Sequence, residues 1–338
     1  MSNLAQLELN QGTLAATARS ARVVLDGLDG DERIAQMNRL PSGFHPLDTF
    51  LSGGFLPQDM VILGGKPGTG KTVAMLQWAR GIAIDGHNAA VISYDHGERS
   101  MIGRLLALEL GEAAKDVDAT THEHLRSKVK DHMAGVCDAD ELVAYHPAIE
   151  SAYQTLETYS DRLFLQRGSI MHTDLGELRA VAQQVVGPGG AMFVDFIQKV
   201  PSPEATEIAQ GTAVANGLKD IAVEHEVAMI AAASVTEEGL RQRRLRVDHL
   251  NASSALVHEA DLLLLINEKA TALSKVHLAY DLTLLESSRN KIVITIEKNR
   301  EGPSQISFEF EKEFADFRFN PEGGFLSETL IDDTMFEQ

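Results

Sequence analysis

The sequence predicts an α/β fold in which a mostly parallel sheet carries helices on both faces. From residue 60 onward, short apolar runs alternate with amphipathic helical patterns, which is typical of parallel strands joined by helical crossovers. Nearer the C-terminus, apolar and polar residues alternate with a period of two in closely spaced segments, a pattern that indicates antiparallel hairpins. We therefore expect a parallel core with an antiparallel C-terminal extension.

Six apolar runs have the length of buried strands, and three later segments have the alternating pattern. The runs are residues 60–64, 89–94, 162–166, 191–195, 227–233 and 261–266, and the alternating segments are 277–287, 291–297 and 305–311. Helical spacing of apolar residues connects the runs. In the helix expected after 89–94, Ile102, Leu105 and Glu109 share one face, and Gly111 can end the helix.

The chain divides by composition into three parts. Residues 1–39 form a polar, alanine-rich leader with a weak amphipathic pattern, which is expected to be a tail or a helix that docks elsewhere. Residues 40–320 carry the α/β pattern, and residues 112–160 within them form a polar helical insert. Residues 321–338 form an acidic tail.

Composition sets limits on partners and compartment. The 338 residues are 44% hydrophobic and 23% charged, as in an ordinary globular protein, and the net charge is −19. The single cysteine, Cys137, excludes an internal disulfide framework and favours the reducing cytoplasm. No run approaches the ~18 apolar residues of a membrane span, so we expect no membrane partner. Taken alone, the acidity argues against nucleic-acid binding, because phosphates repel an acidic surface.

Residues 65–72 match the pattern G-x-x-x-x-G-K-[ST] of phosphate-binding loops. Glycines let the backbone turn so that its N–H groups point at a phosphate, and the helix that follows adds its positive N-terminus. The predicted nucleotide-binding residues are Gly65, Lys66, Pro67, Gly68, Thr69, Gly70, Lys71 and Thr72. We expect Lys71 to bridge the β- and γ-phosphates of ATP as a catalytic residue, and the Thr72 hydroxyl to bind Mg²⁺.

A second metal ligand is expected at the end of the apolar run 191–195. Asp195 closes this run, and a carboxylate is costly to bury unless it has a partner. Mg²⁺ with its waters is a suitable partner, because it prefers oxygen ligands. The alternative is an aspartate that caps a turn at the end of the strand.

The order of these motifs resembles the RecA-like ATPase domain of the hexameric replicative helicases, the DnaB family. LPSGFHPLD at 40–48 and SGGF at 52–55 are similar to the family's lead-in to the phosphate loop. Further similar segments follow in the same order: VDFIQ at 194–198, LKDIAVE at 218–224, SSAL and EAD within 253–261, and IEKNREGP at 296–303. The glycine-rich lead-in is also similar to the RadA and KaiC branch of the same superfamily.

The resemblance implies a homo-oligomeric ring, expected to be a hexamer, in which ATP lies between subunits. Lys298 and Arg300 match the lysine and arginine with which a neighbouring subunit reaches the γ-phosphate in this family. They lie two residues apart on a predicted strand and therefore share a face. An arginine that reaches the transferring phosphoryl group accelerates transfer by ~10³–10⁵. The alternative is a solvated strand face.

Two positions depart from the family pattern near the expected γ-phosphate. The family has a catalytic glutamate where this chain has Asp95, which is one methylene shorter, and Glu98 is the second candidate for this role. Asp95 and Glu98 also fit a helix N-cap with its capping-box partner, which would be a purely structural role. The family has a glutamine that senses the γ-phosphate where this chain has Ser234, whose reach is shorter.

The loop after Ser234 is the expected DNA-binding element. Four arginines lie within six residues of it: Arg241, Arg243, Arg244 and Arg246. In the helicases the corresponding loop faces the central channel and binds single-stranded DNA, and arginine suits phosphate because its donors are planar and permanently charged. The alternative is a solvated helix face paired with Glu237, Glu238 and Asp248. The other expected channel loop, 201–207, carries no cation, which weakens the case for DNA.

The motifs predict a ring-forming DNA helicase or translocase of DnaB type that hydrolyses Mg-ATP and grips single-stranded DNA, with a loader or primase-like protein as a further partner. A second hypothesis is a RadA/KaiC-like regulatory or recombination ATPase that oligomerises on ATP and does not unwind DNA. Asp95, Ser234 and the acidic surface favour the second, whereas the arginines and residues 296–303 favour the first. A nucleotide-stabilised scaffold is a third hypothesis. The acidity restricts DNA to a concentrated site such as a pore.

Overall fold

The computed structural model describes residues 20–23, 38–251, 253–273, 286–328 and 330–331. The chain forms two units, residues 1–38 and 39–338, and the fold and site described below belong to the second. Within the described ranges, no helix is long and apolar enough to cross a membrane.

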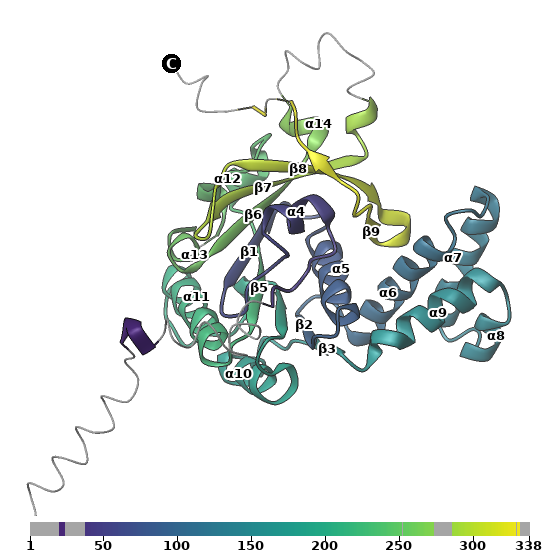
Figure 1. Cartoon of the computed structure of the whole chain (residues 1–338), viewed down its shortest axis with the longest axis horizontal. Coiled ribbons are helices and arrows are strands. Elements are labelled where there is room, and N and C mark those ends of the chain that lie inside the picture. Colours follow the sequence, from purple (N-terminus) through teal and green to yellow (C-terminus); the bar gives the residue numbers. More distant parts are fainter. Residues whose placement is uncertain (1–19, 24–37, 252, 274–285, 329, 332–338) are drawn as a thin grey trace, which may run out of the picture. The chain divides into compact units, whose positions relative to one another are not determined.

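One mixed sheet organises the second unit, as the sequence predicts (Figure 1). Its strands lie in the order β10-β8-β7-β6-β1-β5-β4-β2-β3, and β9 pairs with β8. The parallel part consists of β1 (Met60–Gly65), β2 (Ala89–Ser93), β3 (Leu163–Arg167), β4 (Ala191–Asp195), β5 (Ala228–Ala233) and β6 (Leu262–Glu268). The antiparallel part consists of β7 (Lys291–Asn299), β8 (Ile306–Glu313), β9 (Arg318–Phe319) and β10 (Gly324–Phe325). The mostly parallel core with antiparallel C-terminal strands is therefore confirmed.

The predicted strands agree with the structure except in one segment. All six apolar runs are strands of the parallel part, and 291–297 and 305–311 lie in β7 and β8. Of the segment 277–287, residues 277–285 lie outside the described residues, and residues 286–288 form a helical turn instead of a strand. The prediction was wrong there because the sequence ESSRN favours a turn, since short polar side chains compete for backbone hydrogen bonds.

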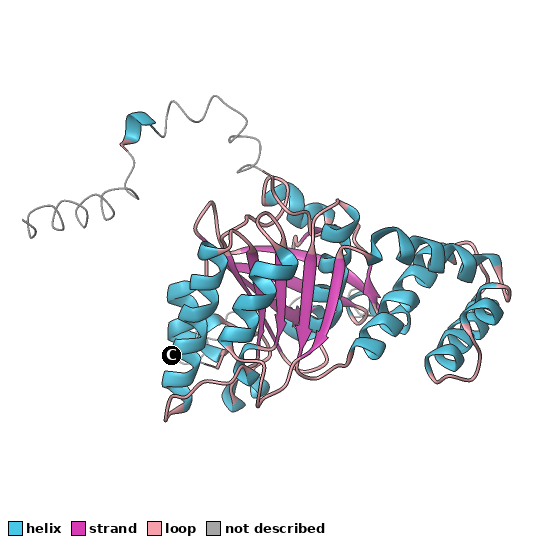
Figure 2. Cartoon of the chain, turned by 90° about the horizontal axis from the view of Figure 1, so that it is seen from below, coloured by secondary structure: helices cyan, strands magenta, loops and turns pink. Residues whose placement is uncertain are grey.

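Helices cover both faces of the sheet (Figure 2). One hydrophobic core joins the sheet to α4 (His45–Phe50), α5 (Lys71–Ile84), α6 (Glu98–Ala113), α7 (Ala119–Met133), α8 (Ala139–Val143) and α9 (Pro147–Ser160). The other core joins it to α10 (Leu175–Val181), α11 (Glu207–Glu224) and α13 (Ser253–Glu259). Side chains alternate between the two, as a strand requires: Val61 and Leu63 of β1 belong to the first core, and Met60 and Ile62 to the second. The short α12 (Glu237–Arg241) and α14 (Lys269–Ala272) follow β5 and β6.

Gly111 does not end its helix, contrary to the prediction. Helix α6 continues to Ala113, and Gly111 lies buried within its last turn. A Cβ atom at Gly111 would come within 2.8 Å of the Asp316 Cβ and 3.1 Å of the Arg318 Cδ. The glycine is therefore needed for close packing against the segment that follows β8.

Glu109 is a buried carboxylate that joins three helices. It is 1% exposed and lies on the inner face of α6, where the helical spacing places it. Arg80 of α5 donates to it through two nitrogens, and the Tyr159 hydroxyl of α9 donates to it at 2.7 Å. Burial and the Glu109 charge raise the pKa of Tyr159, so its hydroxyl remains a donor.

Glu109→Ala should reduce the free energy of unfolding by about 3–5 kcal/mol, because it leaves the Arg80 charge without its buried partner. Urea denaturation measures the effect. Glu123→Ala, an exposed carboxylate on α7, is the control and should change stability by less than about 0.5 kcal/mol. Equal small losses in both variants would contradict a stabilising role of the buried network.

Asp59, directly before β1, is a partly buried carboxyl group next to a second carboxylate. The neighbouring Asp261 accepts hydrogen bonds from the Met60 N–H at 2.8 Å and from Lys219 at 2.6 Å, and pairs with Arg300 at 2.8 Å. Burial and the Asp261 charge raise the pKa of Asp59 from 3.8 to about 6. The folded state therefore holds this proton more tightly than the unfolded state does.

Asp59→Asn should stabilise the protein at pH 8 and have little effect at pH 4. In the wild type, stability that is present below the unfolded pKa of 3.8 is lost as the pH rises through about 6, because the folded state must then accommodate the charge. Since the group is partly solvated, we expect a gain of about 1–2 kcal/mol at pH 8. Urea denaturation at both pH values measures the difference, and a gain that is the same at pH 4 would refute this explanation.

Candidate nucleotide-binding site

The phosphate-loop motif forms a turn between β1 and α5. Gly68 and Gly70 have φ angles of +80° and +97°, which residues with side chains rarely adopt. A Cβ atom on Gly70 would also lie 2.5 Å from the Phe319 ring and 2.7 Å from the Phe314 ring. Gly70 is the N-cap of α5 and provides no side-chain hydrogen bond to the first turn. The N-terminal N–H groups of α5 are therefore suited to bind a phosphate.

The Lys71 ammonium lies over the same loop. It donates to the carbonyl oxygen of Gly65 at 2.6 Å and to that of Lys66 at 3.1 Å. Burial lowers the pKa of Lys71, and the Asp195 charge opposes this shift. A partly dehydrated ammonium held by neutral carbonyls gains from exchanging them for phosphate oxygens, because charge-assisted hydrogen bonds are stronger.

Thr72 and Asp195 meet beside this lysine, although they lie 123 positions apart in the sequence. The Thr72 hydroxyl donates to the Asp195 carboxylate at 2.8 Å, and Ser93 donates to it at 3.3 Å. Asp195 is 3% exposed, and these neutral hydroxyls are its hydrogen-bond donors among the described side chains. A buried carboxylate next to a hydroxyl, without a cation in contact, fits Mg²⁺, which takes hard oxygen ligands and retains waters or phosphate oxygens.

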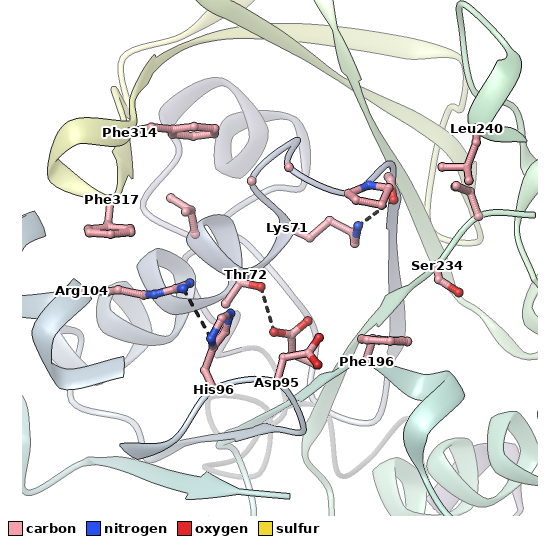
Figure 3. Close-up of a pocket in the computed structure, with 17 residues that line it drawn as sticks. Lys71, Thr72, Asp95, His96, Arg104, Phe196, Ser234, Leu240, Phe314 and Phe317 are labelled. Carbon is pink, nitrogen blue, oxygen red and sulfur yellow. Dashed lines mark hydrogen bonds between the residues drawn. The ribbon is translucent and has the colours of Figure 1, made fainter. Parts of the chain in front are cut away.

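These groups line a cavity of about 500 Å³, a size typical of small-molecule sites (Figure 3). Lys71 and Thr72 lie between its two ends. Phe314 and Phe317 lie at one end, and Ser234 lies at the other. The cavity is at the carboxyl ends of the parallel strands, which is where open parallel sheets bind ligands.

Four residues near the aromatic end were not identified from the sequence: His96, Arg104, Phe314 and Phe317. The Arg104 guanidinium lies 5.2 Å from the Phe317 ring centroid and 3.4 Å from the His96 Nδ1 atom. Burial lowers the pKa of Arg104, and burial and Arg104 together lower that of His96. No local sequence pattern connects Arg104 or the two phenylalanines to the phosphate loop.

Of the two candidate catalytic carboxylates, the structure places Asp95 in the cavity and Glu98 outside it. Asp95 lines the cavity and forms an ion pair with Lys199. Glu98 is the first residue of α6, and its carboxylate accepts a hydrogen bond from the Arg167 N–H at 2.7 Å at the end of β3. The capping alternative is wrong, because the N-cap of α6 is Gly97 and no side chain caps the helix.

Ser234 lines the cavity directly after β5. Its N–H donates to the Gln198 side chain at 3.0 Å, and its hydroxyl accepts from the Asn251 amide at 2.9 Å. The hydroxyl hydrogen is therefore free to be directed toward a ligand, although the oxygen is already held in place.

Lys298 lies within β7 and Arg300 directly after it, so the two cations are close together but not on one strand as predicted, and both lie outside the cavity of their own chain. Lys298 donates to the Val257 carbonyl at 2.5 Å, and Arg300 donates to the His258 carbonyl at 2.6 Å while pairing with Asp261. Both cations thus lie at the C-terminal end of α13, where the helix dipole favours positive charge. Their role at the nucleotide of a neighbouring subunit stays a prediction.

The four arginines of the predicted DNA-binding loop lie in different environments. Arg241 is exposed at the end of α12 and Arg243 is half-buried, and among the described residues neither has a carboxylate partner. Arg246 lies 3.8 Å from Glu297. Arg244 is buried and donates to a backbone carbonyl at 3.3 Å, so it is not accessible as Arg241 is. The alternative prediction pairs these arginines with Glu237, Glu238 and Asp248. Among the described residues, neither Arg241 nor Arg243 forms such a pair.

This loop also contacts the phosphate loop. The Lys66 ammonium donates to the Gln242 carbonyl, which lies between Arg241 and Arg243 in the sequence. Leu240 of α12 lines the cavity itself. A ligand that moves Lys66 therefore changes a contact of the arginine-bearing segment.

Gly70→Ala should destabilise the protein by about 1–3 kcal/mol more than Gly68→Ala does. Both positions have positive φ, but only a Cβ at Gly70 meets the Phe319 and Phe314 rings, whereas one at Gly68 meets nothing within 4 Å. Chemical denaturation of the two variants separates the steric effect from the backbone effect. Equal stabilities would mean that the rings yield freely.

Comparison with known proteins identifies the family to which the chain is similar. The model of the DnaB-like helicase C-terminal domain matches residues 39–319. The replicative DNA helicase DnaB of Mycoplasma pneumoniae is 24% identical over an alignment of 350 positions, which covers 94% of this chain and 68% of that protein. DnaB of Helicobacter pylori is 24% identical over 68% of this chain and 44% of its own length. The DNA repair protein RadA of Brucella abortus is 33% identical over 28% of this chain and 20% of its own length, so the chain spans only part of these relatives.

Two solved structures share the fold. One is an ATPase domain, which superposes with a TM-score of 0.63 at 18% identity, covering 88% of this chain and 95% of that one. A DnaB-like replicative helicase, described together with its interactions with primase, superposes with a TM-score of 0.67 at 17% identity, covering 93% of this chain and 70% of that one. At these identities the likeness concerns the fold, and it confirms the expected RecA-like architecture.

Proposed function

We propose that this chain, which belongs to the family of DnaB-like helicase C-terminal domains, is the ATP-hydrolysing motor of a ring-shaped DNA helicase or translocase. The observation that supports this most directly is the convergence of Lys71, Thr72 and Asp195 on one cavity that also contacts an arginine-bearing loop. Nucleotide chemistry and a surface for a polyanion are thus adjacent. We further propose that the motor works in the cytoplasm, in keeping with the single cysteine.

ATP would place its phosphates on the loop and its base toward the aromatic end. The N-terminus of α5 and Lys71 would bind the phosphates, and Thr72 and Asp195 would hold Mg²⁺, which when bound neutralises charge on the phosphate oxygens. The planes of Phe317 and Arg104 offer a stacking surface for a purine. Asp95, the carboxylate of the cavity that is not assigned to Mg²⁺, would orient the attacking water.

A hexameric ring would explain the position of Lys298 and Arg300. Both lie outside the cavity of their own subunit, and the Arg300 side chain is 47% exposed. A cation that acts on a neighbour's nucleotide must be accessible at the surface of its own chain. We therefore propose that they approach the γ-phosphate of the adjacent subunit.

Single-stranded DNA would bind to the segment that carries Arg241 and Arg243. Neither side chain has a carboxylate partner among the described residues, so both are available for phosphates without breaking an ion pair. The contact between Lys66 and Gln242 connects this segment to the nucleotide. By analogy with the solved helicase described with primase, a primase or loader protein is the proposed partner.

A regulatory or recombination ATPase of RadA or KaiC type is the second candidate. The short Asp95 is paired with Lys199, and the Ser234 oxygen is held by Asn251, so both groups near the expected γ-phosphate are engaged. Slow hydrolysis suits a protein that oligomerises on ATP and does not travel along DNA. The match to RadA proteins agrees with this alternative.

The ATPase rate with and without single-stranded DNA separates these functions. Lys71→Ala should abolish nucleotide binding, which fluorescent-nucleotide titration measures. Arg241→Ala/Arg243→Ala should keep the DNA-free ATPase rate within about twofold, lose stimulation by DNA, and lower the salt dependence of DNA binding by a slope of about 1.4, from two lost phosphate contacts.

The charge-matched control is Lys130→Ala/Arg289→Ala, which removes two exposed cations elsewhere and should retain stimulation. ATP hydrolysis without DNA binding at low salt would favour the regulatory ATPase. Retention of hydrolysis in Lys71→Ala would contradict the assignment of the phosphate loop.

A further inference from the structure

The candidate catalytic carboxylate is held by a lysine that the family motifs do not include. Asp95 follows β2, and Lys199 ends the 3₁₀ turn Ile197–Lys199 that follows β4. The two strands are neighbours with Ser93 opposite Asp195, so both segments leave the sheet at the same edge. There the Lys199 ammonium pairs with the Asp95 Oδ1 atom and lies 5.1 Å from the Phe196 ring centroid.

Lys199 also lies at the base of an exposed loop. Val200 is buried, and residues 203–207 that follow are exposed. The loop 201–207 has carboxylates at Glu204 and Glu207 and no lysine or arginine. Lys199 is therefore the lysine or arginine nearest to this loop in the sequence, and it is a candidate partner for a phosphate that binds there.

The pair is accessible enough to exchange partners. The Lys199 side chain is 35% exposed and that of Asp95 is 42% exposed. Exposed ion pairs are weak, with an equilibrium effect of at most about fivefold, so a single phosphate contact is sufficient to compete. While the pair persists, the Lys199 ammonium occupies one oxygen of Asp95, and that oxygen is not available to a water molecule.

We propose that Lys199 is a positioning residue that restrains Asp95 until single-stranded DNA at the loop 201–207 takes up its ammonium. This rests on the ATP-driven, DNA-binding function proposed above. Once released, Asp95 accepts a proton from the attacking water, whose oxygen bonds to the γ-phosphorus while the bond from that phosphorus to the β–γ bridging oxygen breaks. ADP and inorganic phosphate leave, and Asp95 returns the proton to solvent.

The first test compares ATPase rates. Lys199→Gln should raise the DNA-free rate several-fold and reduce the stimulation by single-stranded DNA, because Asp95 is then free from the start. Lys199→Arg should retain the restraint. Lys115→Gln, which removes the lysine of an exposed pair with Glu112 at the end of α6, is the matched control and should behave as the wild type.

The second test does not depend on hydrolysis. By reciprocity, removing the Asp95 charge should release Lys199 for DNA. With a non-hydrolysable ATP analogue present, Asp95→Asn should bind single-stranded DNA up to about fivefold more tightly than the wild type does. Lys199→Gln/Asp95→Asn should lose this gain, and the absence of tighter binding in Asp95→Asn would overturn the proposal.

The outcomes distinguish the restraint from the proposed function. If the wild type shows neither ATPase activity nor DNA stimulation, the proposed function fails. If the wild type is stimulated and Lys199→Gln is stimulated by the same factor from the same basal rate, only the restraint is refuted. If Lys199→Gln binds nucleotide but is inactive, Lys199 acts on the reacting phosphate and the restraint is refuted as well.

Discussion

The site depends on one constraint, the parallel register of the central strands. Ser93 pairs with Asp195 across β2 and β4, and Gly64 pairs with Ala233 across β1 and β5. Because parallel strands end at the same edge, this register brings the phosphate loop, Asp195 and the residue after β5 to one place. The hydrogen bond from Thr72 to Asp195 then connects the start of α5 to β4. A slip of one residue in β4 would turn Asp195 to the other face of the sheet.

The fold was predictable because the central strands are buried on both faces. All residues of β1, β4 and β5 are buried, so these strands appear as uninterrupted apolar runs whatever their partners are. Glu109 and Gly111 could not be interpreted locally. In the sequence, Glu109 is a charged residue at a core position, and only the structure shows its partners Arg80 and Tyr159. Gly111 resembles a helix terminator in the sequence, and only the structure shows that Asp316 packs against it. Contacts between distant segments decide both cases.

The candidate site was predictable to the extent that it is local in sequence. The phosphate loop is one motif, whereas Arg104 and Phe317, which line the other half of the cavity, come from α6 and from the segment after β8, which no spacing rule connects. Charge has the same limitation. Arg241 and Arg244 are neighbours in a basic run, but one is exposed and the other buried, because burial depends on how the loop folds.

Two lysines connect the nucleotide-site region to two other segments of the chain. Lys66 donates to the Gln242 carbonyl between Arg241 and Arg243, and Lys199, which pairs with Asp95, precedes the loop 201–207. A phosphate can replace the present partner of each ammonium. Each lysine therefore has two states, bound to its protein partner or bound to a phosphate, and a ligand that binds one state more tightly shifts their populations. The net charge of −19 makes such shifts selective. An acidic chain repels a polyanion on average, so a polyanion would gain affinity where such cations are accessible, and Lys66 and Lys199 both lie beside the proposed nucleotide site.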